Sequence, residues 1–434
     1  MPQQTPPRVL LVSMHTSPVD QPGSGDAGGM NVYVLHLARS LAQRGWDVDM
    51  ATLDRDPMHP EGITVAPLSN GLRLLSVALP GAASAPKEQL PEFAVEFGRA
   101  LATFYDDDDD DAPLLVHAHY WLSGVAAREI CEALKIPLML TLHTSAAVKN
   151  LRAGPGENPE PASRELAERE LVASSCTLVV NTPAEADHMV ELYGASRDRI
   201  RVIPPGVDPE IFYPRAQTAS ADDSGEPSVT SIASIAPSSS ARAAGRPFTV
   251  LCAGRMQPLK GPQILVAAMG LLRHEHPDCA IRLILAGVGS PDFLAALHRL
   301  VAEYDVADVI EFQGSMPSSE LAELMRSVDA VAMPSSSETF GLVALEAQAC
   351  GTPVLATDVD GLRYAVEDHR TGWLVPGRTP ELWAEALYRA ASNPEHWRAM
   401  SQAAAERARE LTWDHVAAQH EVAYTRCAAE PVNT

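Results

Sequence analysis

Residues 9–53 read "VLLVSMHTSPVDQPGSGDAGGMNVYVLHLARSLAQRGWDVDMATL". An apolar run at 8–13 leads into a loop and then into an amphipathic helix pattern at 29–44, and a second apolar run follows at 47–52. This order predicts a βαβ unit with parallel strands. The loop carries glycines that let the backbone approach a ligand closely, namely Gly23, Gly25, Gly28 and Gly29. With a helix N-terminus behind it, the loop suggests a cradle for a phosphate or a nucleotide.

The same alternation of strand and helix continues along the chain. Further strand-like runs lie at 72–77, 114–118, 137–142, 177–181, 200–203, 248–253, 281–286, 309–312, 329–333 and 353–356. Helical patterns alternate with them at 121–135, 262–273, 292–303, 318–327 and 341–350. Apolar strands that alternate with helices indicate an α/β protein whose parallel sheets are covered on both faces.

One low-complexity segment interrupts the pattern. Residues 216–246 are rich in Ser, Ala, Pro and Gly without periodicity, which is typical of a flexible linker or insertion. A chain of 434 residues also exceeds the size of one ordinary core. We therefore expect two Rossmann-like domains whose sheets face a central cleft, divided as 1–212, a linker at 213–246, 247–412, and a C-terminal helix at 413–434 that could cross back to the first domain.

Composition narrows the classes of function. The net charge of −23 argues against a nucleic-acid partner, because phosphates would be repelled. An anionic small substrate would need a local cluster of Arg and Lys. No apolar run reaches the roughly 18 residues that span a bilayer, so no membrane partner is expected. The chain starts without a basic-then-apolar signal segment, which favours a cytoplasmic location.

The cysteines and one aspartate run point to no metal centre. The six cysteines show no C-x-x-C spacing, and we expect reduced thiols rather than disulfides or a zinc site: Cys131, Cys176, Cys252, Cys279, Cys350 and Cys427. The run from Asp106 to Asp111 cannot aim all its side chains at one ion, so a solvated loop is the better interpretation.

The segment "AGRMQPLKGPQIL", residues 253–265, follows a predicted strand and precedes a helix. Arg255 and Lys260 are two cations at a helix N-terminus, where free N–H groups and the helix dipole add positive potential. Together they can hold a diphosphate and stabilise it as a leaving group. Taken alone, the pair could also be solvated surface cations, although this interpretation is the less favoured one.

The segment "PSSSETFGLVALEAQACGTPV", residues 334–354, carries two acids. Glu338 precedes the helix, and at helical spacing Glu346 would lie about 12 Å away, the reach of an extended nucleotide sugar. Glu346 interrupts an apolar face and needs a partner there, which a ribose diol would supply. Glu338 in the loop would be free to bind sugar hydroxyls. Either acid alone could be a capping or interior residue.

In this order, the two segments resemble the second domain of the retaining glycosyltransferases of family 4, which have the two-Rossmann GT-B fold. The resemblance implies that Arg255 and Lys260 bind the donor diphosphate and that Glu338 and Glu346 bind the donor sugar and ribose. In the first half, "HAHYWLSG" (117–124), "LHTSAAVKN" (142–150), "SRELAERELV" (163–172) and the opening loop resemble one subfamily, the D-inositol-3-phosphate glycosyltransferases of mycothiol biosynthesis.

This subfamily resemblance implies the substrates UDP-GlcNAc and 1D-myo-inositol 3-phosphate, and it implies a homodimer. The acceptor contacts fall on His15, Asp26, Ala27, Gly28, Gly29, Met30, Asn31, Lys87, Tyr120, Thr144 and Arg164. Further donor contacts fall on Gln21, Pro22, Gly29 and Met316, and on His143 at the sugar's 6-hydroxyl. Catalytic roles fall on Arg255, Lys260, His143 and Glu338. No cofactor is required for catalysis, but a structural Mg²⁺ would be held near Met325, Arg326, Val328 and Thr352.

Without the resemblance, each first-half residue has an ordinary explanation. Tyr120 could belong to the core, Arg164 could pair with Glu168 one helical turn on, and the histidines could be satisfied loop residues. As a group of cations and hydroxyls in an acidic protein they favour a phosphate site. The segment "ALPGAASAP" before Lys87 departs from the family pattern, which leaves the position of that lysine open.

Several other functions remain open. The nearest is a family 4 enzyme with another acceptor, such as a sugar phosphate or a lipid. A UDP-sugar 2-epimerase has a similar two-Rossmann fold and would consume UDP-GlcNAc without an acceptor. A binding-only regulator is disfavoured because Arg255, Lys260, Glu338 and Glu346 are all present. A dinucleotide enzyme is least favoured, since "GSGDAGGMN" lacks a clean G-x-G-x-x-G.

Overall fold

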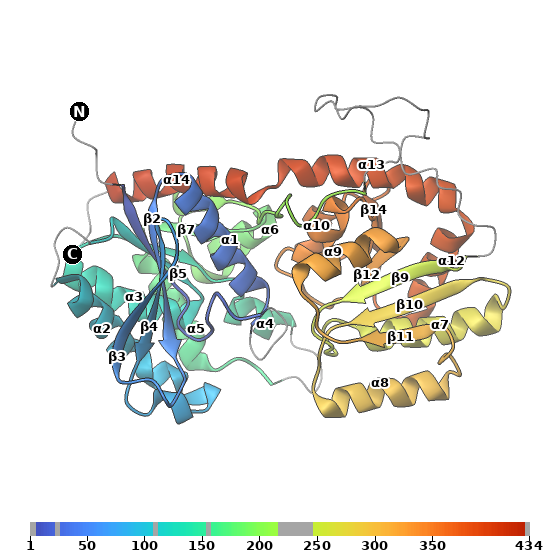
Figure 1. Cartoon of the computed structure of the whole chain (residues 1–434), viewed down its shortest axis with the longest axis horizontal. Coiled ribbons are helices and arrows are strands. Elements are labelled where there is room, and N and C mark those ends of the chain that lie inside the picture. Colours follow the sequence, from blue (N-terminus) through green and yellow to red (C-terminus); the bar gives the residue numbers. More distant parts are fainter. Residues whose placement is uncertain (1–5, 22–26, 107–111, 153–157, 216–245, 430–434) are drawn as a thin grey trace, which may run out of the picture. The chain divides into compact units, whose positions relative to one another are not determined.

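The computed structural model describes residues 6–21, 27–106, 112–152, 158–215 and 246–429. The chain divides into two compact units, one formed by residues 1–206 and 413–434 and the other by residues 207–412 (Figure 1). Most of the predicted linker, most of the aspartate run, and Pro22, Gly23, Gly25 and Asp26 lie outside the described residues.

In the described part of the first unit, eight strands form one sheet in the order β3-β4-β2-β1-β5-β6-β7-β8. The strands are β1 (Arg8–Val12), β2 (Asp47–Asp54), β3 (Gly62–Ser69), β4 (Leu72–Ala78), β5 (Leu115–His119), β6 (Leu138–Thr141), β7 (Thr177–Val180) and β8 (Ile200–Val202). The sheet is parallel except at its edge, where β3 pairs antiparallel with β4. The expectation of a wholly parallel sheet is wrong here, because the mostly exposed edge strand β3 was not recognised as a strand in the sequence.

Helices connect and cover these strands. They are α1 (Gly29–Gln43), α2 (Ala94–Asp106), α3 (Trp121–Leu134), α4 (Ala146–Arg152), α5 (Ala162–Ser174), α6 (Pro183–Tyr193) and α14 (Trp413–Ala429), with the 3₁₀ turns η1 (Ala82–Ser84), η2 (Lys87–Phe93) and η4 (Arg197–Arg199). Helix α14, the last helix of the chain, lies against α1 (Figure 1). Arg44, just after α1, forms ion pairs with Asp414 and Glu421 of α14 beside that contact.

The second unit holds a six-stranded parallel sheet in the order β11-β10-β9-β12-β13-β14, counted over the described residues. Its strands are β9 (Phe248–Ala253), β10 (Ile281–Ala286), β11 (Ile310–Gln313), β12 (Ala330–Met333), β13 (Val354–Thr357) and β14 (Gly372–Val375). Its helices are α7 (Pro262–Glu275), α8 (Pro291–Glu303), α9 (Ser318–Ser327), α10 (Leu342–Ala349), α11 (Leu362–Ala365), α12 (Pro380–Ser392) and α13 (Pro394–Glu410).

The boundary between the units lies at residue 206 rather than at 212. Val207 and Phe212 are buried in one core cluster with Met325 and Ala408 of the second unit. Their apolar side chains thus belong to the second core although they precede the low-complexity segment.

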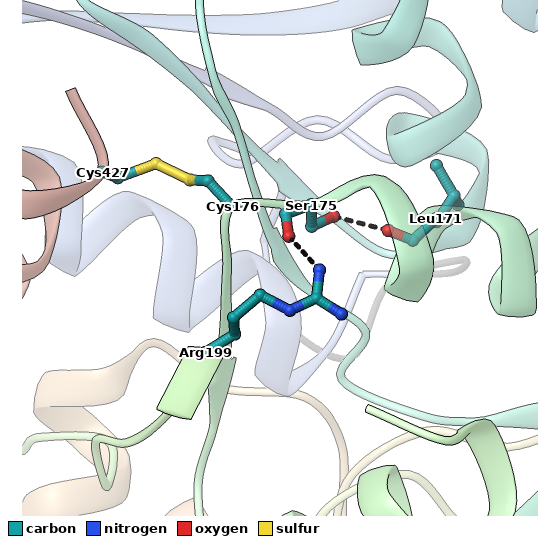
Figure 2. The surroundings of a disulfide bond; sticks show 5 residues. All are labelled: Leu171, Ser175, Cys176, Arg199 and Cys427. Carbon is teal, nitrogen blue, oxygen red and sulfur yellow. Dashed lines mark hydrogen bonds between the residues drawn. A yellow bond between two sulfur atoms is a disulfide. The ribbon is translucent and has the colours of Figure 1, made fainter. Parts of the chain in front are cut away.

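One pair of cysteines is bridged, contrary to the expectation that all six are reduced. Cys176, directly before β7, forms a disulfide with Cys427 of α14, 251 residues further along the chain. Figure 2 shows the bridge beside Ser175, whose hydroxyl donates to the Leu171 carbonyl at 2.7 Å and whose carbonyl accepts from Arg199. No local spacing could reveal this pair, because the return of α14 brings the two residues together. Reduced thiols are typical of the cytoplasm, so the bridge removes this support for a cytoplasmic location, which stays a prediction.

In each sheet the strand order reverses at the unit's first strand, and these points indicate where a ligand would bind. Strand β1 lies between β2 and β5, and β9 lies between β10 and β12. In open α/β sheets, ligands bind outside the carboxyl ends of strands at such points. No described helix combines the length and the apolar content that crossing a bilayer requires.

Candidate functional site

In the second unit, the two segments singled out above converge. Lys260, in the turn after β9, places its Nζ 2.5 Å from Oε1 of Glu338, in the loop after β12. Ser335 donates its hydroxyl to the same carboxylate oxygen at 2.9 Å. Because β9 and β12 are neighbours, residues 78 positions apart meet at one edge of the sheet. One carboxylate oxygen of Glu338 is therefore already shared by Lys260 and Ser335, and its role toward a sugar stays a prediction.

Backbone contacts hold these two loops together. The N–H of Ser336 donates to the Leu259 carbonyl at 2.8 Å. Gly261 has φ 76°, and a Cβ there would meet the Pro334 carbonyl oxygen at 2.3 Å, so this close approach requires glycine. Arg378 donates to the carbonyls of Pro334 at 2.8 Å and Pro258 at 2.9 Å, which clamps both loops.

Arg255 lies directly after β9 and is half-buried. Among the described residues, its guanidinium has no hydrogen-bond or ion-pair partner. An arginine in such a position retains its donors for an anionic ligand. Lys260 follows just before α7, whose first-turn N–H groups face the same end of the sheet.

Glu346 lies on α10 and is half-buried. Burial raises its pKa to about 7. In the part of the chain that the structure describes, its carboxylate accepts no hydrogen bond, so a ligand hydroxyl could still bind it. Because α10 begins at Leu342, Glu338 precedes the helix, and the helical spacing of about 12 Å does not apply to this pair.

In the first unit, Arg164 of α5 is the centre of a buried network. Only 3% of its side chain is exposed. It donates to Glu168 Oε1 at 2.7 Å, to Glu160 Oε2 at 2.9 Å, and to the Thr144 carbonyl and hydroxyl at 3.0 and 3.2 Å. The ordinary explanation, pairing with Glu168 one turn on, is thus correct, and the structure also brings Thr144 to Arg164.

Tyr120 lies beside this network, at the end of β5. Its φ of 80° is in the left-handed region, which is strained for a residue with a side chain. The His15 ring lies 4.5 Å from its ring, and the Arg164 Cζ lies 4.9 Å from its ring centroid. Lys87, exposed at the start of η2, is near enough to act on the Tyr120 pKa. Five predicted acceptor residues, His15, Lys87, Tyr120, Thr144 and Arg164, are therefore brought together.

His143 follows β6 with φ 59°. Its Nε2 lies 2.9 Å from Nδ1 of His119. Burial lowers its pKa to about 3, so its ring is neutral at physiological pH. His119 carried no predicted role, although its alternation with His117 in "HAHY" places both on one face of β5.

At the start of α1, Asn31 holds the loop in place. Its Oδ1 accepts from the Gly28 N–H at 2.9 Å, and its Nδ2 donates to Thr16 Oγ1 at 2.8 Å and to the Ser17 carbonyl at 2.6 Å. Ala27 is buried, Gly29 is exposed and Met30 is half-buried. Gln21 is exposed. Asn31 thus has a clear structural role beside its predicted ligand role.

The remaining predicted residues lie around α9. Met316 packs against the core cluster of this region, and Met325 is fully buried. The Met325 carbonyl accepts from the Thr352 hydroxyl at 2.7 Å, and Arg326 donates to the carbonyls of Ile211 and Tyr213. No group of three His, Cys, Asp or Glu suited to a metal occurs within the described ranges. Backbone oxygens beside a guanidinium are a poor match for the ligands Mg²⁺ prefers, so the structural Mg²⁺ stays a prediction.

Sequence reasoning missed two side chains that hold the second-unit loops. Ser335 could have been noticed as a hydroxyl three residues before Glu338. Arg378 gave no signal, because it follows β14, a strand that the sequence pattern did not predict. Both position the loops rather than offer free groups.

Family models of known proteins match both halves of the chain. Residues 28–206 match the family model "Glycosyl transferase 4-like domain", and residues 238–407 match "Glycosyl transferases group 1". The chain is 42% identical over 412 residues to a D-inositol 3-phosphate glycosyltransferase of Paenarthrobacter aurescens (strain TC1), covering 94% of this chain and 96% of that one. A protein of the same name from Corynebacterium glutamicum (strain R) is 39% identical and covers 95% of each chain.

Solved structures give the same fold. Sucrose-phosphate synthase from Thermosynechococcus elongatus superposes with a TM-score of 0.80 at 29% identity, covering 97% of this chain and 98% of that one. Anabaena HepE in complex with UDP and glucose gives a TM-score of 0.68 at 17% identity, covering 96% and 99%. The fold is therefore GT-B, and the chain is a glycosyltransferase that belongs to the family of D-inositol 3-phosphate glycosyltransferases.

Proposed function

We propose that this enzyme transfers N-acetylglucosamine from UDP-GlcNAc to 1D-myo-inositol 3-phosphate with retention. The products are 1D-myo-inositol 2-acetamido-2-deoxy-α-D-glucopyranoside 3-phosphate and UDP. The proposal for the donor site rests on the contact of Glu338 with Lys260, which lies in the same loop as Arg255 after the end of β9. The name shared by the relatives, at about 40% identity over about 95% of the chain, supports the acceptor.

The donor diphosphate would bind the cations of the second unit. Arg255 has its guanidinium available, and Lys260 stands at the N-terminus of α7, where free N–H groups and the dipole favour anions. Glu338 would bind a hydroxyl of the sugar while keeping Lys260 in place, and Glu346 would bind the ribose diol. HepE, which has the same fold, was solved with UDP and glucose, in keeping with a uridine nucleotide donor.

The acceptor phosphate would bind beside Arg164, Thr144, Tyr120 and Lys87. Glu168 is locked, since its other oxygen accepts from the Ala146 N–H at 2.8 Å and from the Tyr193 hydroxyl at 2.5 Å. Among the described residues, the Glu160 carboxylate pairs with Arg164 and with the exposed Lys149, while its backbone N–H donates to Asn150 Oδ1 at 2.7 Å. The phosphate would therefore take the place of Glu160 and receive the guanidinium donors that Glu160 now accepts.

Transfer would proceed on one face of the sugar. The C1–oxygen bond to the diphosphate breaks, and the bond from C1 to the acceptor oxygen forms on the same side. The acceptor's hydroxyl proton passes to a phosphate oxygen of the departing UDP. Arg255 and Lys260 stabilise the negative charge that grows on the diphosphate, and this stabilisation is the main catalytic contribution.

Two other predictions remain part of this proposal. They are a homodimer, which the family resemblance implies, and a cytoplasmic location. The alternative with most support is a family 4 enzyme with a different phosphorylated acceptor. The buried Arg164 network favours a phosphate on the acceptor over a neutral lipid or sugar.

The test is UDP release from UDP-GlcNAc under three conditions: no acceptor, myo-inositol, and 1D-myo-inositol 3-phosphate. We expect release only with the phosphorylated acceptor. Release without any acceptor would point to hydrolysis or to the epimerase alternative. Equal release with myo-inositol would contradict the phosphate site.

A further inference from the structure

All three nitrogens of the Arg164 guanidinium are engaged in this structure. Nε donates to Glu168 Oε1 at 2.7 Å, and Nη1 lies 2.9 Å from Glu160 Oε2. Nη2 donates to the carbonyl and the hydroxyl of Thr144 at 3.0 and 3.2 Å. Arginine binds phosphate most strongly when two of its nitrogens donate in parallel. A phosphate that binds Arg164 in this way must therefore displace at least one of the present partners.

Glu168 is the partner least able to leave. Its side chain is fully buried, and its Oε2 also accepts from the Ala146 N–H at 2.8 Å and from the Tyr193 hydroxyl at 2.5 Å. Removing this carboxylate from Arg164 would leave a buried charge without its counter-ion, which is strongly destabilising. The Thr144 carbonyl belongs to the main chain and is fixed by the loop that carries it. The partner that gives way must therefore be Glu160.

Glu160 differs from Glu168 in exposure and in anchoring. It lies in the extended segment before α5, and 24% of its side chain is exposed, so water can solvate the carboxylate when it leaves Arg164. Its Oε1 lies 2.8 Å from Nζ of Lys149, which is itself 48% exposed. Its backbone N–H donates to Asn150 Oδ1 at 2.7 Å, a bond that anchors the main chain while the side chain moves.

We propose that Glu160 is an exchangeable counter-ion of Arg164. It neutralises the guanidinium while the acceptor site is empty, yields Nη1 to the acceptor phosphate, and returns to Arg164 when the product leaves. The inference rests on the proposed function, since it takes the acceptor to carry the phosphate.

The exchange affects the acceptor and the product in the same way. Sugar transfer leaves the phosphate on the product, so the Glu160 carboxylate competes with both molecules for Arg164. It weakens both complexes and thereby favours product release. Removing its charge should therefore tighten the binding of phosphate. Loss of a residue that merely holds Arg164 in place would weaken that binding instead.

The first test uses inorganic phosphate and needs no sugar. Thermal unfolding of wild type and Glu160→Gln is followed at pH 8 over increasing phosphate concentrations, with sodium chloride holding the ionic strength constant. A ligand that binds only the folded state raises the Tm as its concentration rises. We expect Glu160→Gln to need about three- to tenfold less phosphate than wild type for the same rise in Tm.

Glu165→Gln is the matched control for this titration. Glu165 also pairs with an arginine four residues on, Arg169, at 2.7 Å, and 29% of its side chain is exposed. It makes no contact with Arg164 among the described residues. Phosphate that binds elsewhere on the chain acts equally on all three proteins, so Glu165→Gln should respond as wild type does.

The second test measures the KM values of both substrates. Glu160→Gln should lower the KM for 1D-myo-inositol 3-phosphate and the inhibition constant of the product by about three- to tenfold, with the KM for UDP-GlcNAc unchanged. An acceptor KM that is unchanged or raised, or a Tm that responds to phosphate as in wild type, would overturn the inference. A wild-type enzyme that transfers no sugar to this acceptor would instead refute the proposed function, and the phosphate titration would still decide the role of Glu160.

Discussion

The two units hold their candidate anion-binding cations in different ways. In the first, Arg164 is 3% exposed and bonds two carboxylates and Thr144. In the second, Arg255 has no partner among the described residues, and Lys260, 32% exposed, shares a single carboxylate. A buried and paired cation such as Arg164 stabilises the fold in addition to any ligand that it binds. Cations such as Arg255 and Lys260 are instead available for catalysis. Mutating these cations should therefore lower mainly the stability in the first unit and mainly the activity in the second.

The largest effect on stability should come from Arg164→Ala. The change leaves the fully buried Glu168 without its ion-pair partner, which should cost about 3–5 kcal/mol of unfolding free energy. Urea denaturation followed by circular dichroism measures this loss. The double variant Arg164→Ala/Glu168→Gln should recover part of it, because the unpaired charge is removed. A single variant as stable as wild type would show that the network does not support the fold.

Arg255→Ala should show the opposite pattern. We expect kcat/KM to fall by about 10²–10³, because one donor to the leaving diphosphate is lost, while the Tm stays unchanged. Steady-state assays of UDP release, with thermal unfolding on the same samples, separate the two effects. Arg282→Ala removes an exposed arginine of β10 that pairs with Glu311 and serves as the control. Activity of Arg255→Ala within a few-fold of the control would refute the proposed leaving-group role.

Breaking the disulfide tests the first unit further. Cys427→Ser should lower the unfolding free energy by about 2–4 kcal/mol, because the bridge joins residues far apart in the chain. Added reductant should lower the Tm of wild type but not that of the variant. Cys279→Ser, a change at a half-buried unpaired cysteine, is the control. If reductant does not change the Tm of wild type, Cys176 and Cys427 are reduced thiols in solution.

The smallest effect concerns Glu346 and pH. Burial raises its folded pKa to about 7, above its unfolded value, so ionisation destabilises the fold as pH rises from about 4.5 to 7. Glu346→Gln should match wild type near pH 4.5 and be more stable at pH 8 by about 1 kcal/mol, since the side chain is only half-buried. Parallel denaturation curves at the two pH values measure this. An equal difference at both values would contradict the raised pKa.

The sequence predicted this fold well where apolar strands alternate with helices. It missed β3, which has an exposed pattern, and β14, and it placed the unit boundary after Phe212 rather than before Val207. Several candidate site residues, such as Arg255 and Glu338, follow strand ends, where the sequence pattern directs attention, whereas Arg164 and Glu346 lie on helices. The contact between Lys260 and Glu338 was not predicted, because it depends on β9 and β12 being neighbours in the sheet. The disulfide was hidden because Cys176 and Cys427 meet only through the return of α14 to the first unit.

The most direct test of the central claim is the product itself. Purified enzyme with UDP-GlcNAc and 1D-myo-inositol 3-phosphate should yield UDP and a GlcNAc-inositol phosphate by mass spectrometry, with the α configuration at the new linkage by NMR. A β linkage would contradict the retaining mechanism. The absence of this product from an enzyme that binds UDP-GlcNAc would contradict the proposed acceptor.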